Sequence, residues 1–161
     1  MDNIGLVVLA SIASAAATYL FMQVKSGTEK IAEYQAMAGR QRALSGTWQG
    51  ESTKTGQDGN TIVYNVRLNL EAAMRQVSGH GKLETEQDGK KYVIDVEVLT
   101  GGFHHGQFMK IEYRGDEQQK AHFGSIIGAL DESGSSIEAT MTGFTELLGT
   151  PGTGQIVLRK T

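Results

Sequence analysis

Cysteine is absent from this chain of 161 residues, and proline occurs only once. The lack of cysteine excludes a disulfide scaffold, a thiolate metal site and a thiol nucleophile. The single proline contrasts with 21 glycines. Glycine supplies the positive φ angles of tight turns, whereas proline cannot donate a hydrogen bond to a β-ladder and is kept out of closed sheets. These two counts together favour a turn-rich β-structure.

A cluster of positive charge is also missing. The chain holds 15 basic and 18 acidic residues, and four basic and three acidic residues lie before residue 45, which leaves 11 basic and 15 acidic residues after it. Proteins that coat DNA or RNA bind the phosphate backbone through clustered Lys and Arg. We therefore expect no long nucleic acid partner. The composition is still compatible with a small anion bound in a local basic pocket.

A long uncharged run lies near the N-terminus, at residues 4–22, with the sequence IGLVVLASIASAAATYLFM. Nineteen helical residues span about 30 Å, the hydrocarbon thickness of a bilayer. The run predicts one transmembrane helix, within an anchor at residues 1–25. Lys25 and Lys30 follow the run and no basic residue precedes it, so the positive-inside rule places the C-terminal domain in the cytoplasm, at the inner (cell) membrane.

A cleaved signal peptide is the alternative for this run, because Ala13-Ser14-Ala15 resembles a signal-peptidase site. Two features favour a retained anchor. The three residues before Ile4 contain no Lys or Arg, and the apolar run continues past Ala15 to Met22. The small residues between positions 10 and 17 let helices approach closely, so we expect a homo-oligomer in the membrane.

A helical linker is predicted at residues 26–44, with Thr28 as its N-cap. Its apolar stripe is modest. We expect this connector to plug one end of the following domain or to pack on a neighbouring subunit.

After Leu44 the apolar residues recur at every second position, as in a strand with one buried face. Turn signals separate the runs at residues 57–60, 87–90 and 131–134. The pattern predicts an all-β domain at residues 45–161, an eight-stranded antiparallel up-and-down (lipocalin-like) barrel. The expected strands are about 45–54, 61–72, 75–86, 91–102, 106–114, 119–130, 136–146 and 154–160.

The first expected strand begins with Gly46-Thr47-Trp48, and the last ends with Leu158-Arg159-Lys160. This pattern resembles the lipocalin and avidin-like (calycin) barrels, where a Gly-x-Trp on strand one packs against a basic side chain of the final strand. The resemblance implies a structural latch in which Arg159 lies over the face of Trp48.

A second resemblance covers nearly the whole chain. A membrane segment precedes a small barrel with Gly-x-Trp-x-Gly from Gly46, a central hairpin at residues 102–106, and Gly-x-Ile-x-Leu-x-Lys from Gly154. This order is similar to the membrane β-barrel effectors of bacterial cyclic-oligonucleotide antiphage (CBASS-like) signalling. The resemblance implies that the barrel binds a cyclic nucleotide and that binding promotes oligomerisation at the membrane. Those effectors usually have two transmembrane helices, and this chain shows one.

A pocket for an anionic nucleotide needs aromatic faces and basic donors. On the expected inward phase lie Tyr64, Tyr92 and Tyr113, and the nearest basic candidates include Arg67, Lys110 and Arg114. Two other hypotheses remain open: a lipocalin-like binder of an apolar small molecule, and a structural membrane-associated barrel without ligand.

The sequence offers no signature of catalysis. His104 and His105 are adjacent, so on a strand they point to opposite faces, and His80 and His122 are isolated; we expect surface or hydrogen-bonded polar roles for them and no metal site. The serines form no Gly-x-Ser-x-Gly elbow, and the glycine-rich stretch at residues 149–154 lacks the Lys of a P-loop. We therefore expect a protein that is not an enzyme and carries no cofactor.

Overall fold

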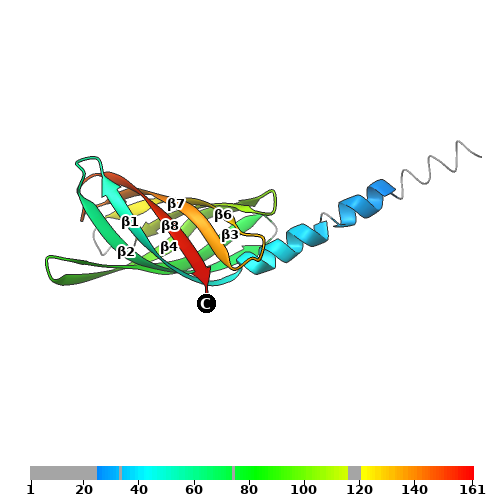
Figure 1. The fold of residues 1–161 in the computed structure, drawn as a ribbon, viewed down its shortest axis with the longest axis horizontal. Helices are drawn as coiled ribbons and strands as arrows, with labels where there is room; N and C mark the ends of the chain where they lie inside the picture. The colour runs from blue at the N-terminus through cyan, green and yellow to red at the C-terminus, as the bar shows by residue number, and fades with distance from the viewer. Residues whose placement is uncertain (1–24, 33, 74, 116–120) are drawn as a thin grey trace, which may run out of the picture. The chain divides into compact units, whose positions relative to one another are not determined.

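Eight antiparallel strands close into a barrel in the computed structural model, which describes residues 25–32, 34–73, 75–115 and 121–161 (Figure 1). Each strand pairs with the next along the chain, and β8 pairs with β1. The predicted eight-stranded antiparallel barrel is confirmed. The strands are β1 (Gly46–Gly56), β2 (Thr61–Ala73), β3 (Gln76–Gln87), β4 (Lys90–His104), β5 (Phe108–Gly115), β6 (His122–Leu130), β7 (Ser136–Thr145) and β8 (Pro151–Lys160).

The core of the barrel follows from the alternation of the strands. On β2, the inward side chains from Ile62 to Leu70 are at most 5% exposed, while the residues between them are exposed. The same alternation runs along β5 and β8. Burying each large apolar side chain contributes about 1.5 to 3 kcal/mol, so the phase of each strand is strongly fixed.

Tight turns connect several of the strands. Asp88 (φ +52°) and Gly89 (φ +72°) form the centre of the β3–β4 turn, and His105 (φ +51°) and Gly106 (φ +66°) form that of the β4–β5 turn. Two successive residues with positive φ match the right-handed twist of the flanking strands. Gly59 (φ +82°) turns the chain between β1 and β2. The turns predicted at residues 57–60 and 87–90 therefore lie where the sequence placed them.

A helix precedes β1 and includes residues 25–32 and 34–44. Thr28 is not its N-cap, because the helix already includes Lys25 and the Thr28 hydroxyl donates a hydrogen bond to the Lys25 carbonyl oxygen at 2.8 Å. A Thr hydroxyl inside a helix can bond backward to a carbonyl in this way.

The end of this helix belongs to the barrel, since residues 38–161 form one compact unit. Leu44 is completely buried, and its carbonyl oxygen accepts a 2.7 Å hydrogen bond from Nε1 of Trp48. Arg40 donates to the carbonyl oxygen of Asp131 at 2.8 Å. These contacts hold residues 38–44 against one end of the barrel.

The latch beside Trp48 uses a different cation from the one we predicted. Lys160 pairs with Trp48 across β1 and β8, and its Nζ atom lies 5.5 Å from the centroid of the indole. Lys160 also donates a hydrogen bond to the Ala43 carbonyl oxygen. Arg159 pairs instead with Gln49 and lies on the outer, exposed face. The prediction of Arg159 was wrong because neighbouring residues of a strand point to opposite faces.

The predicted transmembrane helix at residues 4–22 lies outside the described residues. Within the described part of the chain, no helix is long and apolar enough to cross a bilayer.

Two substitutions at neighbouring residues test which cation forms the latch. Lys160→Met should lower the free energy of unfolding by about 0.5 to 1 kcal/mol, because it removes the cation beside the Trp48 ring. Arg159→Met should change it by less than about 0.5 kcal/mol, because Arg159 is exposed on the outer face. Urea denaturation followed by Trp48 fluorescence measures both. A larger loss for Arg159→Met than for Lys160→Met would contradict this assignment.

Candidate functional site

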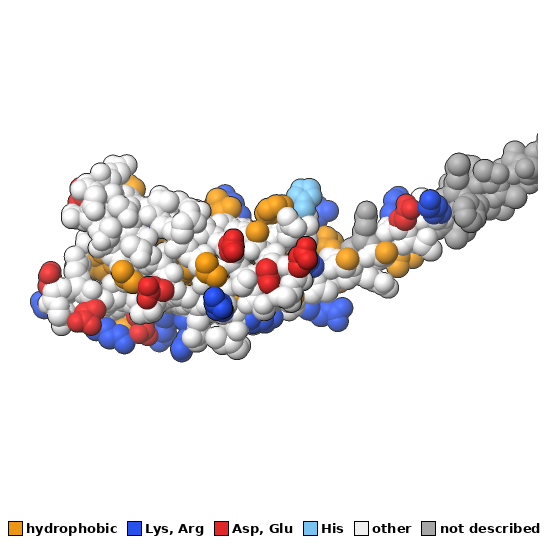
Figure 2. Space-filling view, in the orientation of Figure 1, with side chains coloured by type: hydrophobic (Ala, Val, Ile, Leu, Met, Phe, Trp, Pro, Cys, Tyr) orange, Lys and Arg blue, Asp and Glu red, His pale blue; other side chains and the backbone are white. Residues whose placement is uncertain are grey.

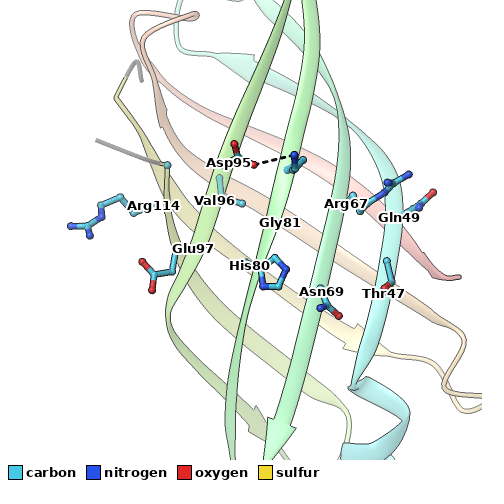
Figure 3. A pocket seen from close by; sticks show the side chains of 12 residues that line it. Thr47, Gln49, Arg67, Asn69, His80, Gly81, Asp95, Val96, Glu97 and Arg114 are labelled. Atoms are coloured by element: carbon cyan, nitrogen blue, oxygen red, sulfur yellow. Dashed lines mark ion pairs between the residues drawn. The ribbon is translucent and has the colours of Figure 1, made fainter. Parts of the chain in front are cut away.

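The candidate site is a hollow of about 890 Å³ on the outer wall of the barrel, which we call the outer groove. It crosses five neighbouring strands, from β1 to β5 (Figure 3). Its lining residues are Thr47, Gln49, Arg67, Asn69, His80, Gly81, Lys82, Asp95, Val96, Glu97, Arg114 and Gly115.

The polar side chains of the groove come from the outward phase of the strands. Arg67 and Asn69 alternate with buried residues of β2, and His80 and Lys82 lie opposite them on β3. Between these two β3 residues lies Gly81, where an added Cβ would be 2.4 Å from the Arg67 carbonyl oxygen. The backbones of β2 and β3 therefore approach closely in the floor of the groove, and a larger residue could not replace Gly81 without a shift of the strands.

Charges of both signs line the outer groove. Lys82 and Asp95 form an ion pair at 3.5 Å, with both side chains more than half exposed. When the Gln49 amide is turned so that its oxygen faces Arg67, that oxygen accepts hydrogen bonds from Nε at 2.9 Å and from Nη2 at 3.0 Å. Because exposed ion pairs contribute at most about 1 kcal/mol, a charged ligand can displace Asp95 from Lys82 at small cost. Figure 2 shows acidic and basic side chains together on the visible face of the barrel.

A second hollow of about 460 Å³ adjoins the outer groove and shares Gln49, Arg67 and Lys82 with it. It adds Arg159 of β8 and Glu84 of β3. The hydrogen bond and charge of Lys91 lower the pKa of the Glu84 carboxyl. Arg67 and Lys82 thus lie where the two hollows meet, at the middle of an elongated surface.

The six ligand-binding residues predicted from the sequence do not form one pocket. Arg67 and Arg114 line the outer groove. Lys110 is also exposed but forms an ion pair with Glu112 at 3.0 Å and is not among the lining residues. The three tyrosines point inward instead: Tyr64 and Tyr113 are buried, and Tyr92 is half-buried. The barrel wall therefore separates the aromatic candidates from the basic ones.

Two groups of polar residues were not predicted from the sequence. The first is the remainder of the groove, including Gln49, Asn69 and Lys82. The alternation of the sequence predicts that these side chains point outward. Their proximity to one another depends on the register of the strands, which the sequence alone does not show. The second is inside the barrel, where Lys54 is completely buried and His122 is 2% exposed. His122 was predicted to be a surface or hydrogen-bonded residue, and both of its ring nitrogens instead lack a hydrogen-bond partner among the described residues.

The other histidines lie where the sequence analysis expected them. His80, His104 and His105 are exposed; His104 ends β4, and His105 is in the β4–β5 turn. The described residues hold no group of three or more His, Asp or Glu side chains that could bind a metal ion.

Buried His122 makes the stability of the barrel depend on pH. Desolvation, followed by the charge of Lys54, lowers the pKa of His122 from 6.5 to about 4. The unfolded chain therefore binds more protons between these two values, and stability must fall as the pH is lowered through that window. Between pH 7 and pH 4 the loss due to His122 should be about 3 kcal/mol. Urea denaturation at several pH values measures it.

The control for this measurement is His80→Gln, which changes an exposed histidine of the same barrel. His122→Gln should flatten the pH profile between pH 4 and 6.5, and His80→Gln should leave it unchanged. An unchanged profile in His122→Gln would show that the histidine is accessible to protons in the folded state.

Neither a protein-family model nor a curated protein matches the sequence.

Proposed function

We propose that this protein is a membrane-anchored sensor whose barrel binds a small anionic ligand in the outer groove. The ligand class we propose is a cyclic oligonucleotide, and the proposed output is oligomerisation at the membrane in antiphage defence. The observation that carries the proposal is the hollow of about 890 Å³ on the outer wall, whose lining includes the three cations Arg67, Lys82 and Arg114.

The size of the groove supports a ligand of this class. Sites for small molecules and cofactors usually measure about 300 to 1,000 Å³. The barrel interior offers less support for a ligand of this size, because the large side chains of Trp48, Tyr64 and Phe103 occupy much of it. An eight-stranded barrel is just wide enough for packed side chains or one small ligand. A ligand with two or three nucleotides therefore fits the outer wall better than the interior.

The side chains of the groove match the parts of a nucleotide. A guanidinium such as that of Arg67 binds phosphate through two parallel hydrogen bonds. The amides of Gln49 and Asn69 both donate and accept, and the carboxylates of Asp95 and Glu97 accept hydrogen bonds from base amino groups. The mixture of signs suits a ligand with anionic phosphates and neutral bases.

A carrier of an apolar molecule is less well supported. Such a protein needs open apolar space inside its barrel, and Trp48, Phe103 and Met109 occupy the apolar interior here. A purely structural barrel remains the outcome if no ligand binds.

The first test titrates the full-length protein in detergent with a panel of cyclic di- and trinucleotides by calorimetry. We expect a dissociation constant below about 100 μM, equivalent to about 5.5 kcal/mol, which weakens as the salt concentration rises. Arg67→Gln should weaken binding at least tenfold.

Lys110→Gln is the matched control, because Lys110 is an exposed cation of the same barrel outside the groove lining. It should leave the affinity within twofold. Equal losses in both variants would indicate attraction by general charge rather than a site at the groove. The absence of binding by the whole panel at 100 μM would reject the proposed ligand, and binding with no change of particle size in detergent would reject the proposed output.

The second test concerns the anchor that we propose at residues 1–25. A reporter fused after Thr161 should be active in the cytoplasm and should fractionate with the inner membrane, because basic residues follow the apolar run. Recovery of a mature chain that starts near Ala16 would show signal cleavage and would overturn the proposed topology.

A further inference from the structure

Seven polar side chains are buried inside the barrel, toward the end where β1 turns into β2. None of them is more than 4% exposed, and they come from six strands. We call this set the Lys54 cluster. Its members are Ser52, Lys54, Tyr64, Thr85, Tyr113, His122 and Thr145.

Most hydrogen-bonding atoms of the Lys54 cluster have no partner among the described residues. Tyr64 donates a hydrogen bond to Oγ1 of Thr145 at 3.3 Å. The unpartnered atoms are Ser52 Oγ, Lys54 Nζ, Thr85 Oγ1, Tyr113 OH and both ring nitrogens of His122. Native proteins satisfy nearly all their buried polar groups, and a buried ammonium without a partner is especially costly. Groups from outside the chain, such as a polar ligand or water, must therefore supply the missing hydrogen-bond partners at this place.

The side chains of the cluster converge from different strands. The ring of His122 lies 5.7 Å from the ring of Tyr64 and 5.7 Å from that of Tyr113. Lys54 lies close enough to His122 for its charge to lower the pKa of the imidazole. Because Tyr64 and Lys54 come from the opposite side of the barrel to β5 and β6, these groups meet in the interior.

Glycines make room for this convergence. An added Cβ at Gly124 would lie 2.8 Å from the Tyr113 hydroxyl, and one at Gly152 would lie 3.2 Å from Cγ of Lys54. Side chains at these inward positions would displace the two polar groups. The neighbouring backbone also excludes side chains here, because the added Cβ would lie 2.0 Å from the Thr142 carbonyl oxygen at Gly124 and 2.9 Å from the Thr55 carbonyl oxygen at Gly152.

The loop between β7 and β8 covers Lys54. An added Cβ at Gly152 would also lie 3.0 Å from Cδ1 of Leu148, so Leu148 and Lys54 flank the same glycine. Leu148 is 8% exposed, and its amide donates to the Thr145 carbonyl oxygen at 3.1 Å. The loop thus separates the cluster from solvent with an apolar side chain.

The charge of the cluster selects its ligand. Burial lowers the pKa of Lys54 to about 8 and that of His122 to about 4, and it raises the pKa of Tyr64 and Tyr113. At pH 7 the cluster therefore carries one positive charge, on Lys54. The described carboxylates of the barrel, such as Glu51 and Glu84, lie on its outer face. The ligand that complements this cluster is a group with a single negative charge that accepts several hydrogen bonds.

We propose that the Lys54 cluster is a second binding site, inside the barrel and separate from the outer groove, which takes the carboxylate group of a small organic acid. The carboxylate accepts hydrogen bonds from Lys54, from the Tyr113 hydroxyl and from one nitrogen of neutral His122. A carboxylate accepts about four hydrogen bonds, so it can accept from all three of these groups at once.

The test uses the full-length protein in detergent and a panel of sodium formate, acetate, propionate and benzoate. Thermal unfolding is recorded against concentration, with acetamide as the neutral analogue and sodium chloride at equal ionic strength as the salt control. At least one carboxylate should raise the melting temperature in a saturable way, because a ligand that binds only the folded state stabilises it. The purified protein is also extracted with solvent for mass spectrometry, which detects an acid that remains bound through purification.

Lys54→Met is the main variant, since it keeps the length of the side chain and removes the charge. It should weaken the response at least tenfold, and Lys82→Met, the same change at an exposed lysine of the groove, should not weaken it. Tyr113→Phe removes one hydroxyl and should weaken it about tenfold, so the proposal remains testable if Lys54→Met does not fold.

Two outcomes overturn the proposal: no saturable response together with no extracted acid, or an equal response in the wild type, Lys54→Met and Tyr113→Phe. Arg67→Gln separates this site from the outer groove, because it should weaken nucleotide binding and leave the carboxylate response unchanged.

Discussion

The hydrogen-bonded pairing of β8 with β1 gives every strand of this barrel two neighbours. Once the sheet is closed, each side chain must point either into a narrow interior or out to solvent. Trp48 and the end of the helix at Leu44 fill one end of that interior, and Lys160 of β8 lies beside the indole. The core, the latch, the outer groove and the Lys54 cluster all depend on this division into an inside and an outside.

The sequence was most informative where its physical signal is local. The alternation from Ile62 to Leu70 and the Asp88-Gly89 turn identify strands and a hairpin without knowledge of the partner strand. The barrel and most strand limits could be predicted for this reason. The latch prediction failed by one residue, since Arg159 and Lys160 are both basic and only the register of β8 against β1 separates them.

The candidate sites were harder to predict because they are assembled from several strands. Arg67 lies on the outer wall between two buried residues, and Tyr64 lies three positions earlier on the inner face. The inward-facing tyrosines and the basic residues nearest to them therefore lie on opposite faces of one wall. Gln49 and Lys82 become neighbours of Arg67 only through the pairing of β1 with β2 and of β2 with β3. In the sequence, Lys54 resembles an ordinary surface lysine. Only its inward position in the alternation of β1 shows that it is buried.

The closure of the barrel by its last strand also has a consequence for the biosynthesis of this protein. Trp48 on β1 pairs with Lys160 on β8, so the first and last strands of the barrel form one ladder. Contacts between residues so far apart form late, and this ladder cannot form until β8 has emerged from the ribosome. Until then β1 and β7 each present an unpaired edge, which is the state of a sheet most prone to aggregation. The yield of folded barrel in the cell therefore depends on how well these two edges are protected while the rest of the chain is being made.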